Sequence, residues 1–337
     1  MAKTESKKPV FYGGQAVIEG VMMRGPKYAA VSVRRADGHI ETVVREAVPW
    51  LVKNRFWNKP FLRGAFALFD AMRLGVWGLR WSANQAMRDT VATPGKTEAQ
   101  AEARQVNAAE ASGATNLAIT PPEGATMGDT TVKGTMGLGL LLGVGLFIVL
   151  PTLVTGLASG HMGPVGLNAV EGFIRLALFF GYVWGIGKLD GIHRVFQYHG
   201  AEHRTINALE AKAPLTPESV QRFSVIHPRC GTSFMIFVLI LATIVYTFFG
   251  WHPPLERLAI RLGLLPLVAG IAYELLRLAG TFRRSEVMNV ITWPGRFTQT
   301  FTTREPDAQQ AEVAIAALNA VFAAEGEGVE GAVPELA

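Results

Sequence analysis

One stretch of sequence decides the fold class: TMGLGLLLGVGLFIVLPTLVTGLA, from Thr135 to Ala158. It is apolar along its length and contains no charged side chain. A helix rises about 1.5 Å per residue, so about 20 residues cross the roughly 30 Å hydrocarbon core of a bilayer. We therefore predict a transmembrane helix in this stretch.

Three further apolar stretches follow it, Leu167–Gly187, Phe234–Trp251 and Leu258–Ala279. Each of them alone also fits a buried helix of a soluble protein, but four in the last two thirds of one chain favour a membrane domain over residues 134–281. The composition agrees, with 49% hydrophobic residues and a mean hydropathy of +0.24. The predicted fold class is membrane α-helical: four transmembrane helices, a small N-terminal cytosolic β-containing unit and amphipathic helices.

Lysine and arginine residues predict the orientation. We count 18 up to Lys133 and 6 from Lys188 to Arg229, against Arg257 alone in the two loops that face the other side. Because positive residues accumulate on the cytosolic side, we predict a multi-pass protein of the cell (inner) membrane with both termini in the cytosol. The net charge of +5 then reflects topology, and we expect the lipid bilayer rather than nucleic acid as a partner.

The N-terminal part is predicted to lie outside the membrane. Residues 1–60 form a small cytosolic β unit, in which Asp37-Gly38 marks a hairpin turn. Residues 61–88 fit an amphipathic helix at the membrane interface, and packing of the same helix on the β unit is an equal alternative. Residues 89–133 are rich in Ala, Thr, Gly and Glu, contain no aromatic residue and are predicted to be a disordered linker.

The C-terminal part is also expected in the cytosol. Residues 282–325 form a segment with a positive anchor at Arg283-Arg284 and an amphipathic helix from Pro306 to Ala324. Residues 326–337 are predicted to be a disordered tail. Within the second span, Glu171 and Arg175 are four residues apart, so we expect them to pair on one helix face.

The strongest chemical signal is the predicted cytosolic loop 188–232, which contains four of the seven histidines and the single cysteine. On a helix, His199 and His203 project from one face and can bind one metal ion, with Glu202 beside them. His-x-x-Glu-His is the pattern of zinc hydrolases in which two histidines bind Zn²⁺ and the glutamate acts as general base. A catalytic zinc site needs a third protein ligand. The candidates are Glu274, His227 and Cys230.

Each candidate also has a simpler interpretation. Glu274 lies in a span, where a carboxylate is costly, and a pair with Arg277 accounts for it equally well. If His227 and Cys230 both join His199 and His203, the four residues form a closed structural site instead of a catalytic one. A second candidate site is the glycine-rich segment around Glu19 and Arg24, which an ordinary pair of tight turns and a Glu19–Arg24 ion pair also explain.

The sequence resembles a bacterial family of multi-span membrane proteins of unknown function, the YqhQ-like family, whose members are labelled as metal-dependent enzymes. The matching blocks are Gly13–Pro26, Phe196–His203, His227–Ser233, Tyr273–Glu274 and Thr303–Pro306. The resemblance implies a membrane fold and a metal-dependent activity. It carries over the positions Glu19, Arg24, His199, Glu202, His203, His227, Cys230 and Glu274.

Two functions follow as hypotheses. The first is a membrane-embedded, zinc-dependent hydrolase that cleaves an amide or ester bond near the cytosolic membrane surface. The second is a membrane scaffold or assembly factor in which the histidines and the cysteine form a structural site. A transporter is a third and weaker option, because four spans enclose a path only as a homo-oligomer.

Overall fold

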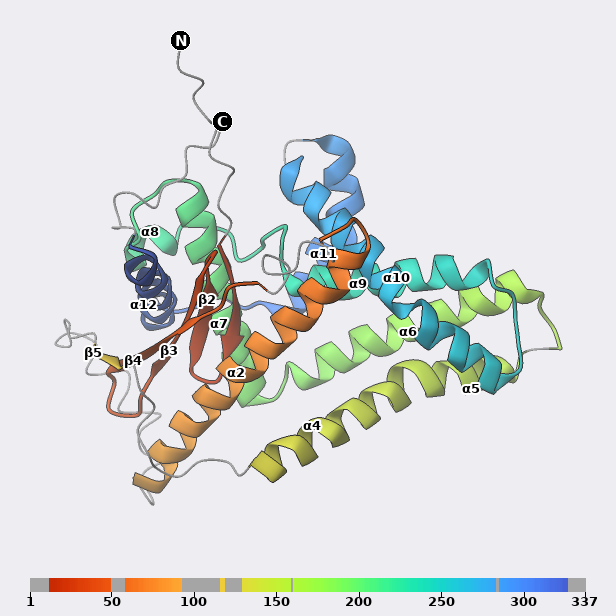
Figure 1. The fold of residues 1–337 in the computed structure, drawn as a ribbon, viewed down its shortest axis with the longest axis horizontal. Coiled ribbons are helices and arrows are strands. Elements are labelled where there is room, and N and C mark those ends of the chain that lie inside the picture. Colours follow the sequence, from red (N-terminus) through yellow and green to blue (C-terminus); the bar gives the residue numbers. More distant parts are fainter. Residues whose placement is uncertain are drawn as a thin grey trace, which may run out of the picture.

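The structure is a computed structural model that describes residues 12–49, 58–92, 116–118, 129–158, 160–282 and 285–326. A small sheet with its covering helices forms one end of the molecule, and long helices extend away from it (Figure 1). The expected anchor Arg283-Arg284 and the expected tail from 327 onward lie outside the described residues.

Four antiparallel strands form the expected N-terminal sheet: β1 (Gly13–Val17), β2 (Gly20–Arg24), β3 (Tyr28–Arg34) and β4 (Ile40–Glu46). The predicted hairpin at Asp37-Gly38 is confirmed, because Gly38 has φ +95° in the turn between β3 and β4. A short strand β5 (Asn116–Ala118) pairs in parallel with β4. The stretch 89–133, expected to lack regular structure, therefore contributes this strand.

Both faces of the sheet are buried, each under a helix. Successive strand residues point to opposite faces and so contribute to two separate cores. On one face, Met23 and Ala30 pack against Leu318 and Val321 of α12 (Ala308–Glu325). On the other face, the side chains of Val17, Met22, Ala29 and Val31 pack against Leu74 of α2 (Leu62–Ala92), with Trp77 and Trp81 alongside. The predicted C-terminal amphipathic helix is thus present as α12, and it covers the sheet.

Helix α2 is the element predicted to lie at a membrane interface. It packs on the sheet, which is the alternative that the sequence left equally open. Its Asp70 is buried and forms an ion pair with Arg24 of β2, with 2.6 Å between Asp70 Oδ2 and Arg24 Nη2. Phe69 and Met72 remain largely exposed on the helix surface, so contact of this surface with lipid stays a prediction.

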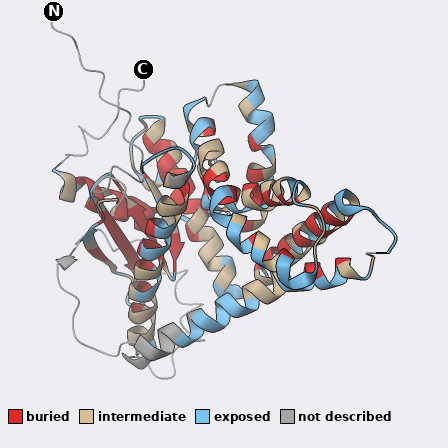
Figure 2. Ribbon diagram, turned by 45° about the vertical axis from the view of Figure 1, so that its right-hand side comes forward, coloured by how far each residue is buried: buried red, intermediate tan, exposed pale blue. Residues whose placement is uncertain are grey.

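The long apolar helices extend from the sheet. The first runs continuously through α4 (Asp129–Val144), the π-helical turn η2 (Gly145–Val149) and α5 (Leu150–Gly156), and is followed by α6 (Pro164–Ile186). α9 (Gly231–Thr247) and α10 (Pro254–Thr281) complete the set. Most of the side chains of α4 whose burial the structure describes are solvent-exposed in the isolated chain, Leu138, Leu140, Leu141 and Leu142 among them (Figure 2). Exposed apolar helices of this kind fit a membrane protein.

Within the described part of the chain, three segments are long and apolar enough to cross a membrane: Gly137–Gly156, Pro164–Ile186 and Pro254–Thr281. The remaining apolar helix, α9, has 17 residues, because the chain leaves the helix after Thr247 and turns at Gly250 with φ +74°. Four transmembrane helices were expected. Among the described residues three helices reach this length and α9 does not, so a fourth transmembrane helix is not confirmed.

The sequence did not predict α11 (Glu286–Thr302), an amphipathic helix between α10 and α12. It packs on α9, where Gly295 lies so close to Ser233 that a Cβ atom at residue 295 would come within 2.7 Å of the serine Cβ. Pro294 lies within this helix, and because proline usually breaks a helix, the sequence around it does not indicate one. Through this contact α11 places its last residues beside the predicted histidine loop.

Candidate metal centre

Much of the predicted histidine loop is helical. It contains α7 (Asp190–Glu210) and the short helix α8 (Pro217–Val220). Helix α7 presents His199 and His203 on one face, with their ring centroids 4.4 Å apart. Cys230 lies at the N-cap of α9, and its Sγ is 3.2 Å from His199 Nε2. One donor atom from each of these three residues lies within 4.8 Å of the others, which is close enough to hold one metal ion.

Two backbone carbonyls fix the orientation of the histidine rings. His199 Nδ1 lies 2.8 Å from the carbonyl oxygen of Thr302, at the end of α11, and His203 Nδ1 lies 2.6 Å from that of Val225. A carbonyl can only accept, so each Nδ1 carries the proton and donates it. In a neutral ring the lone pair then belongs to Nε2. Histidines that bind metal ions are generally held in this way.

The charges of the cluster also favour a cation. Burial alone would raise the pKa of the Cys230 thiol, but His199 and His203 lower it well below its ordinary value. Burial alone would lower the pKa of His199, but the Cys230 sulfur and the Glu202 carboxyl raise it to about 9. Both pKa directions favour a negative charge on the Cys230 sulfur and a proton on His199 when no metal ion is bound. The Thr232 N–H donates to Sγ at 3.4 Å and adds to the stabilisation of the thiolate.

Glu202 is buried beside the cluster, and burial raises its pKa even though both histidines lower it. Its carboxyl accepts a hydrogen bond from the backbone N–H of Gly14. A Cβ atom at residue 14 would lie 3.1 Å from Glu202 Cγ, so glycine at this position lets β1 approach the carboxyl. The paired glycines of β1 thus accommodate a side chain of the candidate site.

Two of the three candidates for the third ligand pair with other residues, although the His227 ring lies 5.8 Å from that of His203. Glu274 forms a bidentate ion pair with Arg63 of α2, at 2.6 Å from Nε and 2.5 Å from Nη2. The alternative partner, Arg277, is more distant at 3.8 Å. The side chain of His227 contacts Glu210 at 3.3 Å. Among the described residues only Cys230 joins the two histidines, so the four-ligand cluster with His227 is not formed.

The expected ion pair between Glu19 and Arg24 is wrong. Glu19 lies in the turn between β1 and β2, with φ +52°, and pairs with Arg194 of α7 at 2.7 Å. Arg24 lies at the far end of β2, about 13 Å further along the strand, and pairs with Asp70. Each residue ties the sheet to a different helix, and neither belongs to the His/Cys cluster.

The segment 303–306 passes across α7 next to the cluster. The Arg304 N–H donates to the Phe196 carbonyl at 2.9 Å. A Cβ atom at Gly200 would lie 2.0 Å from the Arg304 carbonyl oxygen, so only glycine permits this approach. The matching blocks around residues 200 and 304 are therefore adjacent in space.

We expect Gly200→Ala to displace this segment and to destabilise the protein by about 1–3 kcal/mol, the usual cost of overpacking. Gly191→Ala is the matched control, because it lies on the same helix with nothing within 4 Å of the new methyl group. Thermal unfolding of both variants in detergent measures the difference. Equal melting temperatures would contradict the close contact.

A surface pocket of about 310 Å³ lies beside the cluster-bearing loop. The side chains of Ser224, Ile226 and Pro228 line it from one side, and α11 lines it from the other through Met288 and Thr292. Val225 lies between Ser224 and Ile226 in the chain, and its carbonyl accepts the hydrogen bond from His203 Nδ1. No cluster residue lines the pocket, so the segment 224–228 stands between the pocket and the cluster.

The comparisons with known proteins agree with the family resemblance. The model of a family described as "Protein of unknown function (DUF1385)" matches residues 59–324. A relative from Bacillus subtilis (strain 168), named "Uncharacterized protein YqhQ", is 33% identical over 331 residues, which cover 94% of this chain and 93% of the relative. No solved structure matches. Neither name states an activity, so the metal-dependent label implied by the resemblance has no support from these comparisons.

Proposed function

This chain belongs to the DUF1385 family of proteins of unknown function, and we propose that it is a zinc-dependent hydrolase of the membrane. His199, His203 and Cys230 hold the metal ion, and Glu202 acts as the general base. The observation that supports this assignment best is that a backbone carbonyl accepts the Nδ1–H of each histidine. The Nε2 lone pairs of His199 and His203 then remain for a shared metal ion.

The three donors fit zinc in number and kind. Imidazole nitrogen and thiolate sulfur are its usual ligands, and catalytic zinc sites keep three protein ligands with the fourth position open. When bound there, zinc supplies Lewis-acid chemistry that polarises a carbonyl group and acidifies water. Burial raises the pKa of Glu202 toward neutral pH, and a general base accepts and returns a proton most effectively when its pKa lies near the working pH.

The substrate would reach this site through the pocket between the segment 224–228 and α11. Cys230 is 5% and His203 2% exposed, and His199 is half-buried, so we expect the segment to move aside to admit a substrate. The pocket has apolar residues on both sides, Ile226 and Met288 among them, which suits an amide or ester with an apolar portion.

The membrane topology belongs to the same proposal. The excess of Lys and Arg in residues 188–229 supports a cytosolic position for the cluster and for both termini, in the inner membrane. A thiol ligand also needs a reducing compartment, which the cytosol provides.

The decisive experiment is Glu202→Gln. We expect the variant to keep close to one zinc ion per chain and to lose about 10²–10⁴-fold in hydrolysis of p-nitrophenyl esters, the usual contribution of a general base. Elemental analysis of purified protein gives the zinc content, and absorbance of the released nitrophenolate gives the rate.

Glu218→Gln is the control for this experiment, because it removes the same charge from an exposed position near the other end of the loop. Wild-type protein that purifies without metal in chelator-free buffer would refute the metal site. Equal rates for Glu202→Gln and Glu218→Gln, with zinc present in both, would refute the hydrolase.

A structural role for the cluster is the second candidate function, and the burial of the ligands favours it. The two carbonyl contacts join α7 to α11 and to the loop at Val225, so a metal ion here would lock three segments together as part of a scaffold. In that case Glu202→Gln is silent, while His199→Ala loosens the segment 224–228, which limited proteolysis detects.

A further inference from the structure

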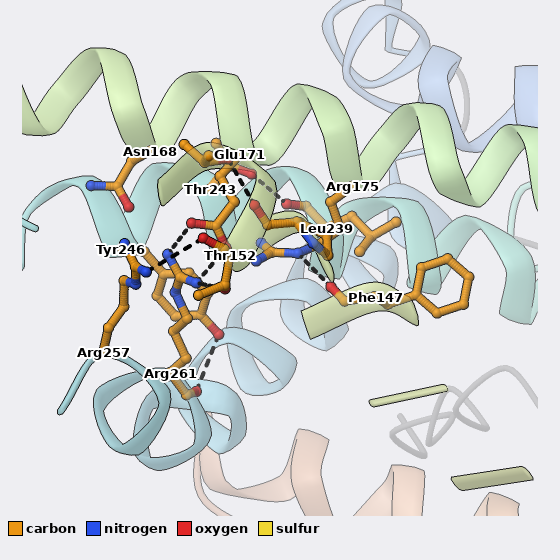
Figure 3. Close-up of polar contacts among 12 residues, drawn as sticks. Phe147, Thr152, Asn168, Glu171, Arg175, Leu239, Thr243, Tyr246, Arg257 and Arg261 are labelled. Atoms are coloured by element: carbon orange, nitrogen blue, oxygen red, sulfur yellow. Dashed lines mark hydrogen bonds and ion pairs between the residues drawn. The ribbon is translucent and has the colours of Figure 1, made fainter. Parts of the chain in front are cut away.

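A second group of buried charges lies among the long helices, at the opposite end from the sheet. Figure 3 shows Glu171 and Arg175 of α6 beside Arg261 and Arg257 of α10, with Thr152 of α5 between them. Arg229, next to Cys230, contacts Gly280 at the other end of α10. Arg257 is therefore about 35 Å along that helix from the metal-site end.

The single carboxylate in this group pairs with two of the three arginines. Arg175 Nη2 donates to Glu171 Oε1 at 2.6 Å, which confirms the pair expected from their spacing. Arg261 forms a bidentate ion pair with both oxygens of the same carboxylate, and Thr152 donates to Oε1 at 2.9 Å. Four hydrogen bonds therefore converge on Glu171, and none of them comes from Arg257.

Arg175 has a further structural task. Pro151 has no N–H to donate to the carbonyl four residues earlier, which is that of Phe147. Arg175 Nε donates to this carbonyl at 2.9 Å and replaces the missing donor. Arg175 and Arg261 are thus accounted for by contacts within the bundle, and Arg257 is not.

The guanidinium of Arg257 is buried, and two of its three nitrogens have no hydrogen-bond partner among the described residues. The residue is 5% exposed, and its Nε and Nη1 have no hydrogen-bond acceptor within the described part of the chain. Its Nη2 makes only a 3.5 Å contact with the Thr152 carbonyl, and the group stacks on the Trp251 ring at 3.7 Å. The four charged groups together carry a net charge of +2, which is costly to bury without a counter-ion.

We propose that Arg257 binds a phosphate oxyanion, supplied by a lipid headgroup or by free phosphate. The two free N–H groups form the fork that recognises two oxygens of one phosphate. Arg257 lies within the first turn of α10, at the depth where a spanning helix meets the headgroups, and Trp251 is the kind of residue that marks this level. Leu255 and Phe248 are more than 80% exposed beside it and offer contacts to acyl chains.

The test compares Arg257→Gln with Arg277→Gln, which removes the same charge from an exposed position at the other end of α10. Delipidated protein in neutral detergent is titrated with inorganic phosphate and, separately, with dihexanoyl phosphatidylglycerol. Phosphorus NMR detects binding, and thermal unfolding records stabilisation. We expect wild type and Arg277→Gln to bind at least one of the two probes, and Arg257→Gln to bind it at least tenfold more weakly.

Binding of inorganic phosphate identifies a free-phosphate site, whereas binding of the lipid alone identifies a headgroup site, and either result supports the proposal. Without ligand, Arg257→Gln should unfold at the same temperature as wild type or higher, because an uncompensated buried charge has been removed. The proposal is overturned if wild type binds neither probe, or if both variants bind equally. A loss of stability without ligand also overturns it, since Arg257 would then be a structural residue.

Discussion

Cys230→Ser should lower the affinity for zinc by about 10²–10³-fold. Zinc sites of this kind bind with about 10–16 kcal/mol, so loss of one ligand in three removes about 3–4 kcal/mol, which corresponds to that change in affinity. Serine keeps the size of the side chain and the cap of α9, so the fold is preserved. Competition with a chromophoric chelator measures the affinity.

His227→Gln is the matched comparison for this prediction. The residue lies three positions earlier in the same loop and was an equal candidate from the sequence. Its ring lies 5.8 Å from that of His203, but its Nε2 pairs with Glu210 and is not within ligand distance of the cluster. We expect its zinc affinity to stay within a few-fold of wild type. If the two variants lose affinity equally, the three-ligand assignment is wrong and His227 completes a four-ligand site.

Glu171→Gln should destabilise the helix bundle by about 3–5 kcal/mol. The change removes the only carboxylate among three buried arginines, and breaking a buried ion pair by loss of one partner typically has this cost. Glu286→Gln, at the exposed start of α11, is the control and should be neutral. Thermal or denaturant unfolding in detergent gives both values.

The outcome of the Glu171 variant also separates two views of this cluster. If the arginines are solvated by water or headgroups, Glu171→Gln costs less than about 1 kcal/mol, as for an exposed pair. A cost of that size would show that the buried geometry around Glu171 does not persist in detergent. The metal site at the other end of α10 should keep its zinc in either case.

Local patterns in the sequence were sufficient for the parts of the site that lie on one element. His199 and His203 are one helical turn apart, so their convergence follows from helix geometry alone, and the same holds for Glu171 and Arg175. The hairpin at Asp37-Gly38 is equally local. Each of these predictions needed a single secondary-structure element or a single turn.

Contacts between distant segments could not be predicted in this way. The third ligand depends on how the chain returns from α8 to α9, because His227 and Cys230 both lie beside α7, but among the described residues only Cys230 comes within ligand distance of His199 and His203. The partner of Glu274 is Arg63, which is 211 positions away. Nothing in the spacing of either residue indicates that α2 passes beside α10, so the nearer Arg277 was the only visible alternative.

The contact between His199 and the carbonyl of Thr302 has a consequence for biosynthesis. The histidine is made about a hundred residues before the carbonyl that orients it, and the spans around α9 and α10 are made in between. A ribosome must therefore have released α11, and the bilayer must have received the intervening helices, before the ring can take its final tautomer. In the proposed metal site, loading is therefore expected to be a late event, because the His199 ring is oriented only after Thr302 has been made.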